Sequence, residues 1–177
     1  PNGGKVMVFA GIKDVQNVVE RFQGVREALE GSGIEIIDLR TDGGDATKAR
    51  ANAEDTLTAH PDVAGLIGLW AYNAPACLEA VRAAGLIGKV QIVSFDEMPK
   101  TLEAIDEGEI HGTVVQNPYQ FGYDSMVLLR DLVVEGDSAS DAGVPANKIM
   151  YVPTRVLRKG EGLEYKAQCD AWKASLN

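Results

Sequence analysis

Short apolar runs alternate with amphipathic stretches from the start of the chain to about residue 136. Residues 5–10 form the first apolar run, which is typical of a parallel strand covered on both faces. Hydrophobic residues then recur at helical spacing as far as Leu29, and Gly31 and Gly33 end that helix. Four more strands are expected at 34–39, 64–69, 90–95 and 111–115, and four more helices at 45–60, 75–84, 99–106 and 118–135.

Two of these helices begin with capping signals. Asp45 precedes the first alanine-rich helix, where its side chain can accept hydrogen bonds from the first backbone N–H groups. Asn117 and Pro118 open the last helix, with Asn as the cap and Pro in the first turn. Five strand–helix units in succession predict a parallel sheet with helices on both faces, and right-handed connections make it doubly wound. The expected fold class is therefore α/β, in three layers.

The pattern changes after Gly136. Residues 137–143 form a small polar loop, and 148–157 predict two short strands with Pro153 at a kink or an edge. Residues 161–177 predict a terminal helix. We therefore expect one lobe over 1–136, including the helix 118–135, with 137–177 packed on the same domain.

Composition and charge narrow the class of protein. A chain of 177 residues with 45% hydrophobic content suits one α/β domain, and a net charge of −9 leaves no basic surface for a nucleic-acid partner. No apolar run approaches the roughly 20 residues of a membrane span. The first residues resemble neither a signal peptide nor a transit peptide and lead straight into a strand, as expected for a domain of a longer chain. Cys77 and Cys169 have no metal-ligand spacing, so no metal is expected, and they are either free thiols or a disulfide.

Candidate chemistry lies after the strands, because ligands gather at the carboxyl ends of the strands in open parallel sheets. Carboxylates, amides and two aromatic rings dominate these positions. The segments are 11–17, 40–45, 70–73, 96–97 and 116–117. Such groups suit a polyhydroxylated ligand, since carboxylates and amides bind hydroxyls while an aromatic ring packs against the C–H face of a sugar.

Signals for an enzyme are weak. The chain has no Gly-x-Ser-x-Gly motif, no Walker loop and no dinucleotide fingerprint, so neither a catalytic residue nor a cofactor is expected. His60 and His111 are expected at the edge of the sheet away from the strand carboxyl ends, without a nucleophile as partner. Asp42 and Asp45 could suggest the acidic pocket of a response-regulator receiver, but the first strand ends in Ala10-Gly11 and the third in Trp70, which do not fit that site.

Four stretches carry a resemblance to a known family. They are Gly11-Ile12 through Glu20-Arg21 to Gly24; His60-Pro61-Asp62-Val63, followed by Asn73; Val93-Ser94-Phe95-Asp96; and Thr113 to Pro118 through Gly122. In this order they resemble the carboxy-terminal lobe of ribose-type periplasmic sugar-binding proteins, the receptors of ABC importers. The resemblance covers roughly residues 5–136. It implies a type I periplasmic binding protein lobe with a Rossmann/flavodoxin-like fold, and a role in binding instead of catalysis.

The resemblance also implies a ligand site. Asp96 matches a carboxylate that accepts from sugar hydroxyls, Asn73 an amide, and Gln116 the amide at the end of the hinge. The match has gaps: Val19 stands where ribose binders have an arginine, and Gly44 where they have an aromatic ring. Arg21 and Asn17 lie close to Val19, and Trp70 and Tyr72 could supply the missing ring. The candidate set is Asn17, Arg21, Trp70, Asn73, Asp96 and Gln116.

Each candidate also has a structural interpretation. Asn73 and Asp96 could only cap the helices that follow them, and Trp70 could belong to the core. Gln116 could be an ordinary hinge residue, and Arg21 a solvated helix side chain. These alternatives stay open at the level of sequence.

Members of the resembled family have two lobes and about twice this length, so the implied partners are a sugar, a missing amino-terminal lobe and the membrane subunits of an ABC importer, in the periplasm. The helix 118–135 would pack on the missing lobe. Because of its apolar stripe, we expect it here to pack on its own sheet or to form a homodimer with another copy. An effector domain of a lac-repressor-type regulator and a flavodoxin-like enzyme are the alternative functions.

Overall fold

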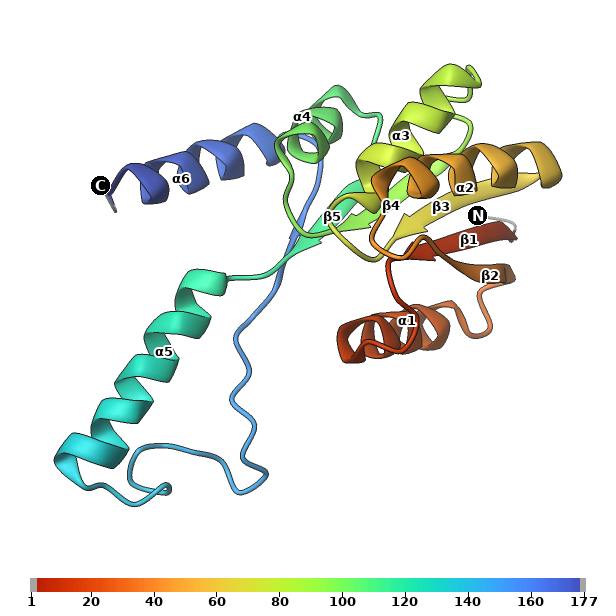
Figure 1. The fold of residues 1–177 in the computed structure, drawn as a ribbon. Helices are drawn as coiled ribbons and strands as arrows, with labels where there is room; N and C mark the ends of the chain where they lie inside the picture. Colours follow the sequence, from red (N-terminus) through yellow and green to blue (C-terminus); the bar gives the residue numbers. More distant parts are fainter. Residues whose placement is uncertain (1–2, 176–177) are drawn as a thin grey trace. The chain divides into compact units, whose positions relative to one another are not determined.

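The structure, a computed structural model, describes residues 3–175 of the chain (Figure 1). The chain divides into two compact units. The first comprises the residues up to Val114 together with those from Val156 onward, and the second comprises Val115–Arg155. The structure thus groups the helix 118–135 with the segment that follows it, whereas the sequence pattern placed it with residues 1–136. The assignment of functional lobes stays a prediction.

A six-stranded sheet organises the first unit (Figure 1). Its order is β2-β1-β3-β4-β5-β6. The strands are β1 (Gly4–Ala10), β2 (Ile34–Thr41), β3 (Val63–Gly68), β4 (Gln91–Phe95), β5 (Gly112–Val115) and β6 (Arg155–Leu157). β1 pairs in parallel with both β2 and β3, and the pairs β3–β4 and β4–β5 are also parallel. The direction of winding reverses between β1 and β3, and a crevice is expected beyond the carboxyl ends of the strands at such a reversal.

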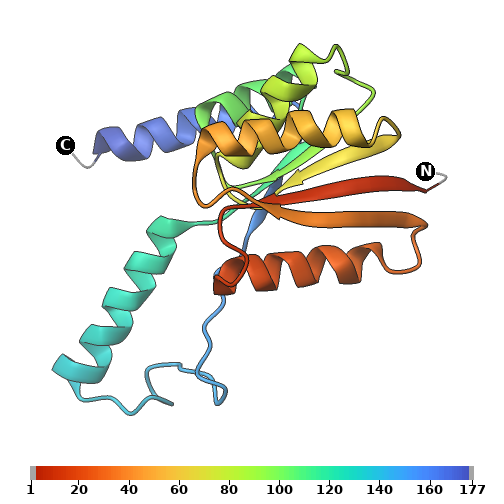
Figure 2. The same ribbon diagram turned by 45° about the vertical axis from the view of Figure 1, so that its right-hand side comes forward.

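Helices cover both faces of this sheet. They are α1 (Gln16–Leu29), α2 (Ala46–Ala59), α3 (Asn73–Ala83) and α4 (Pro99–Glu107), with α6 (Gly162–Ser175) at the end of the chain. Figures 1 and 2 show α1 on one face and α2 with α3 on the other. The sheet carries a buried hydrophobic cluster on each face, because alternate strand residues point to opposite faces. Phe9 and Ile92 belong to one cluster, and Val8 and Leu69 belong to the other. The predicted three-layer α/β class is confirmed.

The local signals for helix ends agree with the structure. The carboxylate of Asp45 accepts from the backbone N–H groups of Thr47 at 2.8 Å and Lys48 at 3.1 Å. The side chain of Asn117 accepts from the N–H of Gln120 at 3.1 Å. None of the helices within residues 3–175 combines the length and the apolar character that crossing a bilayer requires.

The prediction of two strands in 148–157 is wrong. Only Arg155–Leu157 forms a strand, β6, and residues 148–154 have no regular structure. Pro153 lacks a backbone N–H, so it cannot donate to a sheet at this point. The tail forms α6 as expected, and the last predicted residues, 176–177, lie outside the described part.

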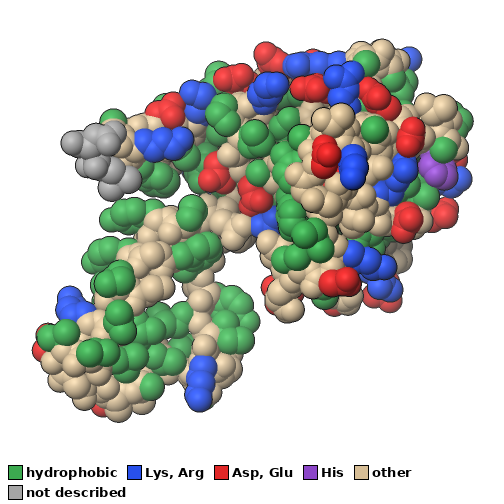
Figure 3. Space-filling model, in the orientation of Figure 1, with side chains coloured by type: hydrophobic (Ala, Val, Ile, Leu, Met, Phe, Trp, Pro, Cys, Tyr) green, Lys and Arg blue, Asp and Glu red, His purple; other side chains and the backbone are tan. Residues whose placement is uncertain are grey.

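The second unit consists mainly of α5 (Pro118–Arg130), which continues as a π-helical turn, η1 (Asp131–Glu135). Phe121 and Leu128 face the following segment, where they line a hollow of about 230 Å³ with Val144 and Met150. Other large apolar side chains of the helix are exposed, and Figure 3 shows apolar side chains gathered on this unit. They are Tyr119, Tyr123, Met126, Leu129, Val133 and Val134, which we call the α5 stripe. None of the α5 residues is buried, so the expected cover of this stripe is not found within the unit.

Candidate functional site

Five of the six candidate residues belong to the first unit and lie in segments that follow its strands. Asn17 and Arg21 lie on the first two turns of α1, which β1 leads into. Trp70 lies between β3 and α3, and Asn73 is the first residue of α3. Asp96 follows β4 directly. Gln116 follows β5 and belongs to the second unit.

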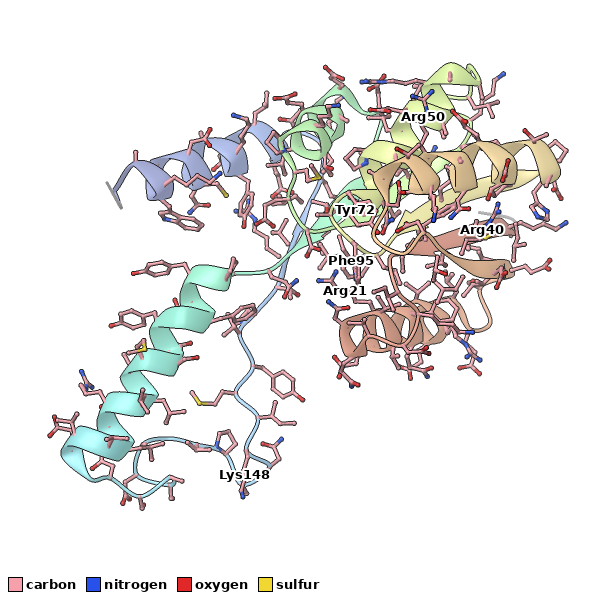
Figure 4. All side chains as sticks on the ribbon, in the orientation of Figure 1. Arg21, Arg40, Arg50, Tyr72, Phe95 and Lys148 are labelled. Atoms are coloured by element: carbon pink, nitrogen blue, oxygen red, sulfur yellow. The ribbon has the colours of Figure 1, made fainter. Side chains whose placement is uncertain are left out.

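Arg21 and Asp96 form a bidentate ion pair. Nη1 and Nη2 of Arg21 donate to the two carboxylate oxygens of Asp96 at 3.1 and 3.0 Å. Nη1 also donates to the carbonyl oxygen of Leu69, and the guanidinium lies 4.8 Å from the ring centre of Phe95, beside it in Figure 4. Only 13% of the Arg21 side chain is exposed. Arg21 is therefore not the solvated helix residue that was one of its two interpretations.

The backbone of Asp96 is fixed in a conformation that side-chain-bearing residues rarely adopt. Its φ is 65°, in the left-handed region. Its N–H donates to the carbonyl oxygen of Val114 at 2.8 Å, and its carbonyl oxygen accepts from the Thr113 hydroxyl at 2.7 Å. Such strain persists only where the surroundings hold it, and it gathers at functional sites. A quarter of the Asp96 side chain stays exposed, so the carboxylate is accessible from solvent.

Trp70 forms a fixed aromatic wall. Its ring lies against the end of β1, where a Cβ on Gly11 would collide with the indole. The indole N–H donates to the side-chain oxygen of Asn17 at 3.2 Å. The ring of Tyr72 meets that of Trp70 edge-on, with centroids 6.1 Å apart and planes at 73°. Trp70 is partly buried against the cluster under α1, so it combines core packing with partial exposure to solvent.

Asn73 is fully buried and hydrogen-bonded within the protein. Its side-chain oxygen accepts from the backbone N–H of Trp70 at 2.9 Å, and its amide nitrogen donates to the carboxylate of Asp42 at 3.0 Å. The backbone of Asn73 packs close to Gly68, where a Cβ would approach the Asn73 Cβ to 2.8 Å. This geometry favours a role in shaping the turn between β3 and α3. Direct ligand contact by Asn73 stays a prediction.

The structure joins Asp42 and Tyr72, neither of which belongs to the set of six candidates. The hydroxyl of Tyr72 donates to the carboxylate of Asp42, and burial together with this carboxylate raises the pKa of Tyr72. The sequence showed that both residues carry polar groups and follow strands. It could not predict that they bond each other, because 30 positions separate them. Glu97 is a further acidic neighbour, whose pKa is raised first by burial and then by the charge of Asp96.

Other titratable groups lie away from this edge. His60 ends α2 and His111 directly precedes β5, so both occupy the amino-terminal edge of the sheet, as expected. The two cysteines are free, which settles the question of a disulfide. Cys77 is buried, and burial raises its pKa to about 12.

The family model described as "Periplasmic binding protein domain" matches residues 1–138. The chain belongs to this family. This periplasmic binding protein domain is 31% identical over 137 residues to the ribose import binding protein RbsB of Escherichia coli (strain K12). That match covers 76% of the chain and 45% of the E. coli protein, so the chain spans less than half the length of this relative.

Two solved structures agree with this assignment. The sugar-binding protein of a sugar ABC transporter from Bacillus halodurans matches with a TM-score of 0.79 and 27% identity, over 93% of this chain and 58% of that one. GanP, a glucose-galactose binding protein from Geobacillus stearothermophilus, matches with a TM-score of 0.78 and 27% identity, over 89% and 54%. The domain thus shares its fold and its family with these proteins, and the resemblance seen in the sequence is confirmed.

Proposed function

We propose that this domain is part of a sugar receptor of an ABC-type importer in the periplasm, and that its strand carboxyl edge binds a monosaccharide or a similar polyol. The observation that carries the proposal is the Arg21-held carboxylate of Asp96, one quarter exposed and fixed by a strained backbone. Arg21 also donates to the carbonyl oxygen of Leu69, the residue before Trp70. The guanidinium of Arg21 therefore links the carboxylate of Asp96 to the segment that carries the Trp70 ring. A hydroxyl acceptor beside an aromatic ring is the combination that sugar binding requires.

The ligand would be held between this domain and a companion lobe. The matched region is about half the length of the relatives, and the α5 stripe is an exposed apolar surface of the kind that packs against another domain. In such a two-lobed receptor, ligand binding shifts an equilibrium between open and closed arrangements. Gln116, at the start of the second unit, would contact the ligand from the hinge. The importer's membrane subunits would be the receptor's further partners.

The domain alone should bind weakly, because it supplies half of the contacts. NMR titration is therefore the appropriate test, with D-ribose, D-allose and D-glucose added at millimolar concentrations to the ¹⁵N-labelled domain. We expect the amide of Asp96 and the indole N–H of Trp70 to shift in a saturable way with at least one of these sugars.

Two variants distinguish sugar binding at Asp96 from the unspecific effect of removing a carboxylate. Asp96→Asn should weaken binding about tenfold, since a hydrogen bond to a charged group contributes about 1.5–3 kcal/mol. Asp170→Asn removes a carboxylate that pairs with Lys166 on exposed α6, and it should leave binding unchanged. Equal shifts in both variants, or no shift with any of the sugars, would contradict the proposal.

A further inference from the structure

A buried carboxylate ties the ends of two strands together on either side of β1. Asp42 follows β2, and only 3% of the residue is exposed. Its Oδ1 accepts from the hydroxyl of Tyr72 and from the backbone N–H of Gly44 at 2.8 Å, while Oδ2 accepts from the amide of Asn73 at 3.0 Å. Two of these donors come from the turn after β3. Because β2 and β3 flank β1, Asp42 spans the point where the winding of the sheet reverses.

The same turn carries Trp70. The side chain of Asn73 accepts from the backbone N–H of Trp70, and the edge of the Tyr72 ring meets the Trp70 ring. Gly11 and Asn17 hold the indole from β1 and α1. The backbone, the ring and the indole N–H of Trp70 therefore each have a contact of their own. Asp42 supports the first two of these through its bonds to Asn73 and Tyr72.

We propose that Asp42 and Tyr72 are positioning residues that fix the ring of Trp70 before ligand arrives, so that the site selects cyclic sugars over the corresponding acyclic alditols. This inference rests on the proposed function. A rigid aromatic wall favours a ligand that presents a preformed apolar C–H face, because packing against it costs such a ligand little conformational freedom. An alditol has the same hydroxyl groups but must first lose the freedom of its open chain.

The test compares Tyr72→Phe with Tyr151→Phe in the full chain. Tyr72→Phe keeps the ring and removes only the hydroxyl that reaches Asp42. Tyr151 is 82% exposed in the second unit, so its variant is the matched control. Both are made in a Trp172→Phe background, which leaves Trp70 as the single indole, since the chain has two tryptophans. Urea unfolding of each variant records stability separately.

The first measurement needs no sugar. The indole N–H resonance of Trp70 and the near-ultraviolet circular dichroism should change in Tyr72→Phe and not in Tyr151→Phe. Asp42→Asn should have a similar effect, because an amide can no longer accept from Tyr72 and Asn73 together. An unmoved Trp70 signal in Tyr72→Phe would overturn the inference.

The second measurement is the ratio of dissociation constants for ribitol over D-ribose and for D-glucitol over D-glucose. The ratio for the parent domain should exceed one and fall by about threefold in Tyr72→Phe, the size of a single aromatic contact. An unchanged ratio would overturn the inference while leaving sugar binding established. Absence of binding by the parent domain would remove the proposed function, and the inference with it.

Discussion

The guanidinium of Arg21 bonds both carboxylate oxygens of Asp96, although 75 positions separate the two residues in the chain. The pair joins α1 to the end of β4, and through the carbonyl of Leu69 it also joins the end of β3. A ligand that reaches Asp96 therefore meets a carboxylate whose position three elements of the fold determine.

Replacing Arg21 should destabilise the domain. Arg21→Met removes two hydrogen bonds to the mostly buried carboxylate of Asp96, and we expect a loss of about 1–3 kcal/mol in the free energy of unfolding, reduced by the partial exposure of the pair. Urea unfolding measures this loss. The double variant Arg21→Met/Asp96→Asn should recover part of it, because it also removes the carboxylate charge that Arg21 bonds. Lys166→Met breaks a solvent-exposed pair with Asp170 and should leave stability nearly unchanged, because water screens such a pair. Equal losses in the two single variants would contradict this account of Arg21.

A methyl group at Gly11 should displace the Trp70 ring. Gly11→Ala places a Cβ 1.9 Å from Cζ3 of the indole, so the ring must move or the strand must shift, at a cost of about 1–3 kcal/mol. Thermal unfolding and Trp fluorescence in the Trp172→Phe background measure both effects.

The control for Gly11 is Gly24, in the interior of α1. A Cβ there meets nothing within 4 Å. Gly24→Ala should raise stability by about 0.5–1 kcal/mol, because alanine is the better helix former. A neutral Gly11→Ala variant with unchanged fluorescence would show that the ring does not lie where the structure places it.

Asp106 should make the docking of α6 sensitive to acid. Its carboxylate accepts from the backbone N–H groups of Leu163 at 2.8 Å, Gly160 at 2.8 Å and Gly162 at 3.1 Å, which lowers the pKa of Asp106. A lowered pKa in the folded state contributes stability above the unfolded value, near 3.8, and this contribution is lost as pH falls through the folded value.

The variant Asp106→Ala should cost about 1 kcal/mol at neutral pH, as for the loss of a helix cap, and should speed hydrogen exchange in α6. Its stability should depend less on pH in the acid range than that of the parent domain. Asp137→Asn, in an exposed loop, is the control. An unaltered acid transition in Asp106→Ala would refute the anchoring role of this carboxylate.

The two thiols should differ in reactivity. Cys77 is buried with its pKa raised to about 12, so almost none of it is thiolate at neutral pH. Cys169 is partly exposed, and burial followed by the charge of Glu97 raises its pKa. A thiol-specific chromogenic reagent should modify Cys169 slowly in the native domain and Cys77 only after unfolding in urea. Rapid modification of Cys77 under native conditions would contradict its burial.

The sequence by itself determined the order and type of the elements, because each depends on neighbours along the chain. Strands appear as apolar runs and helices as periodic ones, and Asp45 and Asn117 cap the helices they precede through bonds two or three residues away. It also indicated that Asn17, Trp70 and Asp96 follow strands. Their meeting at one edge followed only from the rule that parallel strands end together.

The tertiary structure decided which of these groups contact one another. The Arg21–Asp96 pair, the bond from Tyr72 to Asp42 and the contact of Trp70 with Gly11 all join residues at least 30 positions apart. They depend on strand order, which local periodicity does not encode. The irregular course of 148–154 has the same origin, since an extended segment becomes a strand only where an edge with free N–H and C=O groups lies beside it. Packing between distant segments therefore fixed the polar and aromatic residues of this edge relative to one another.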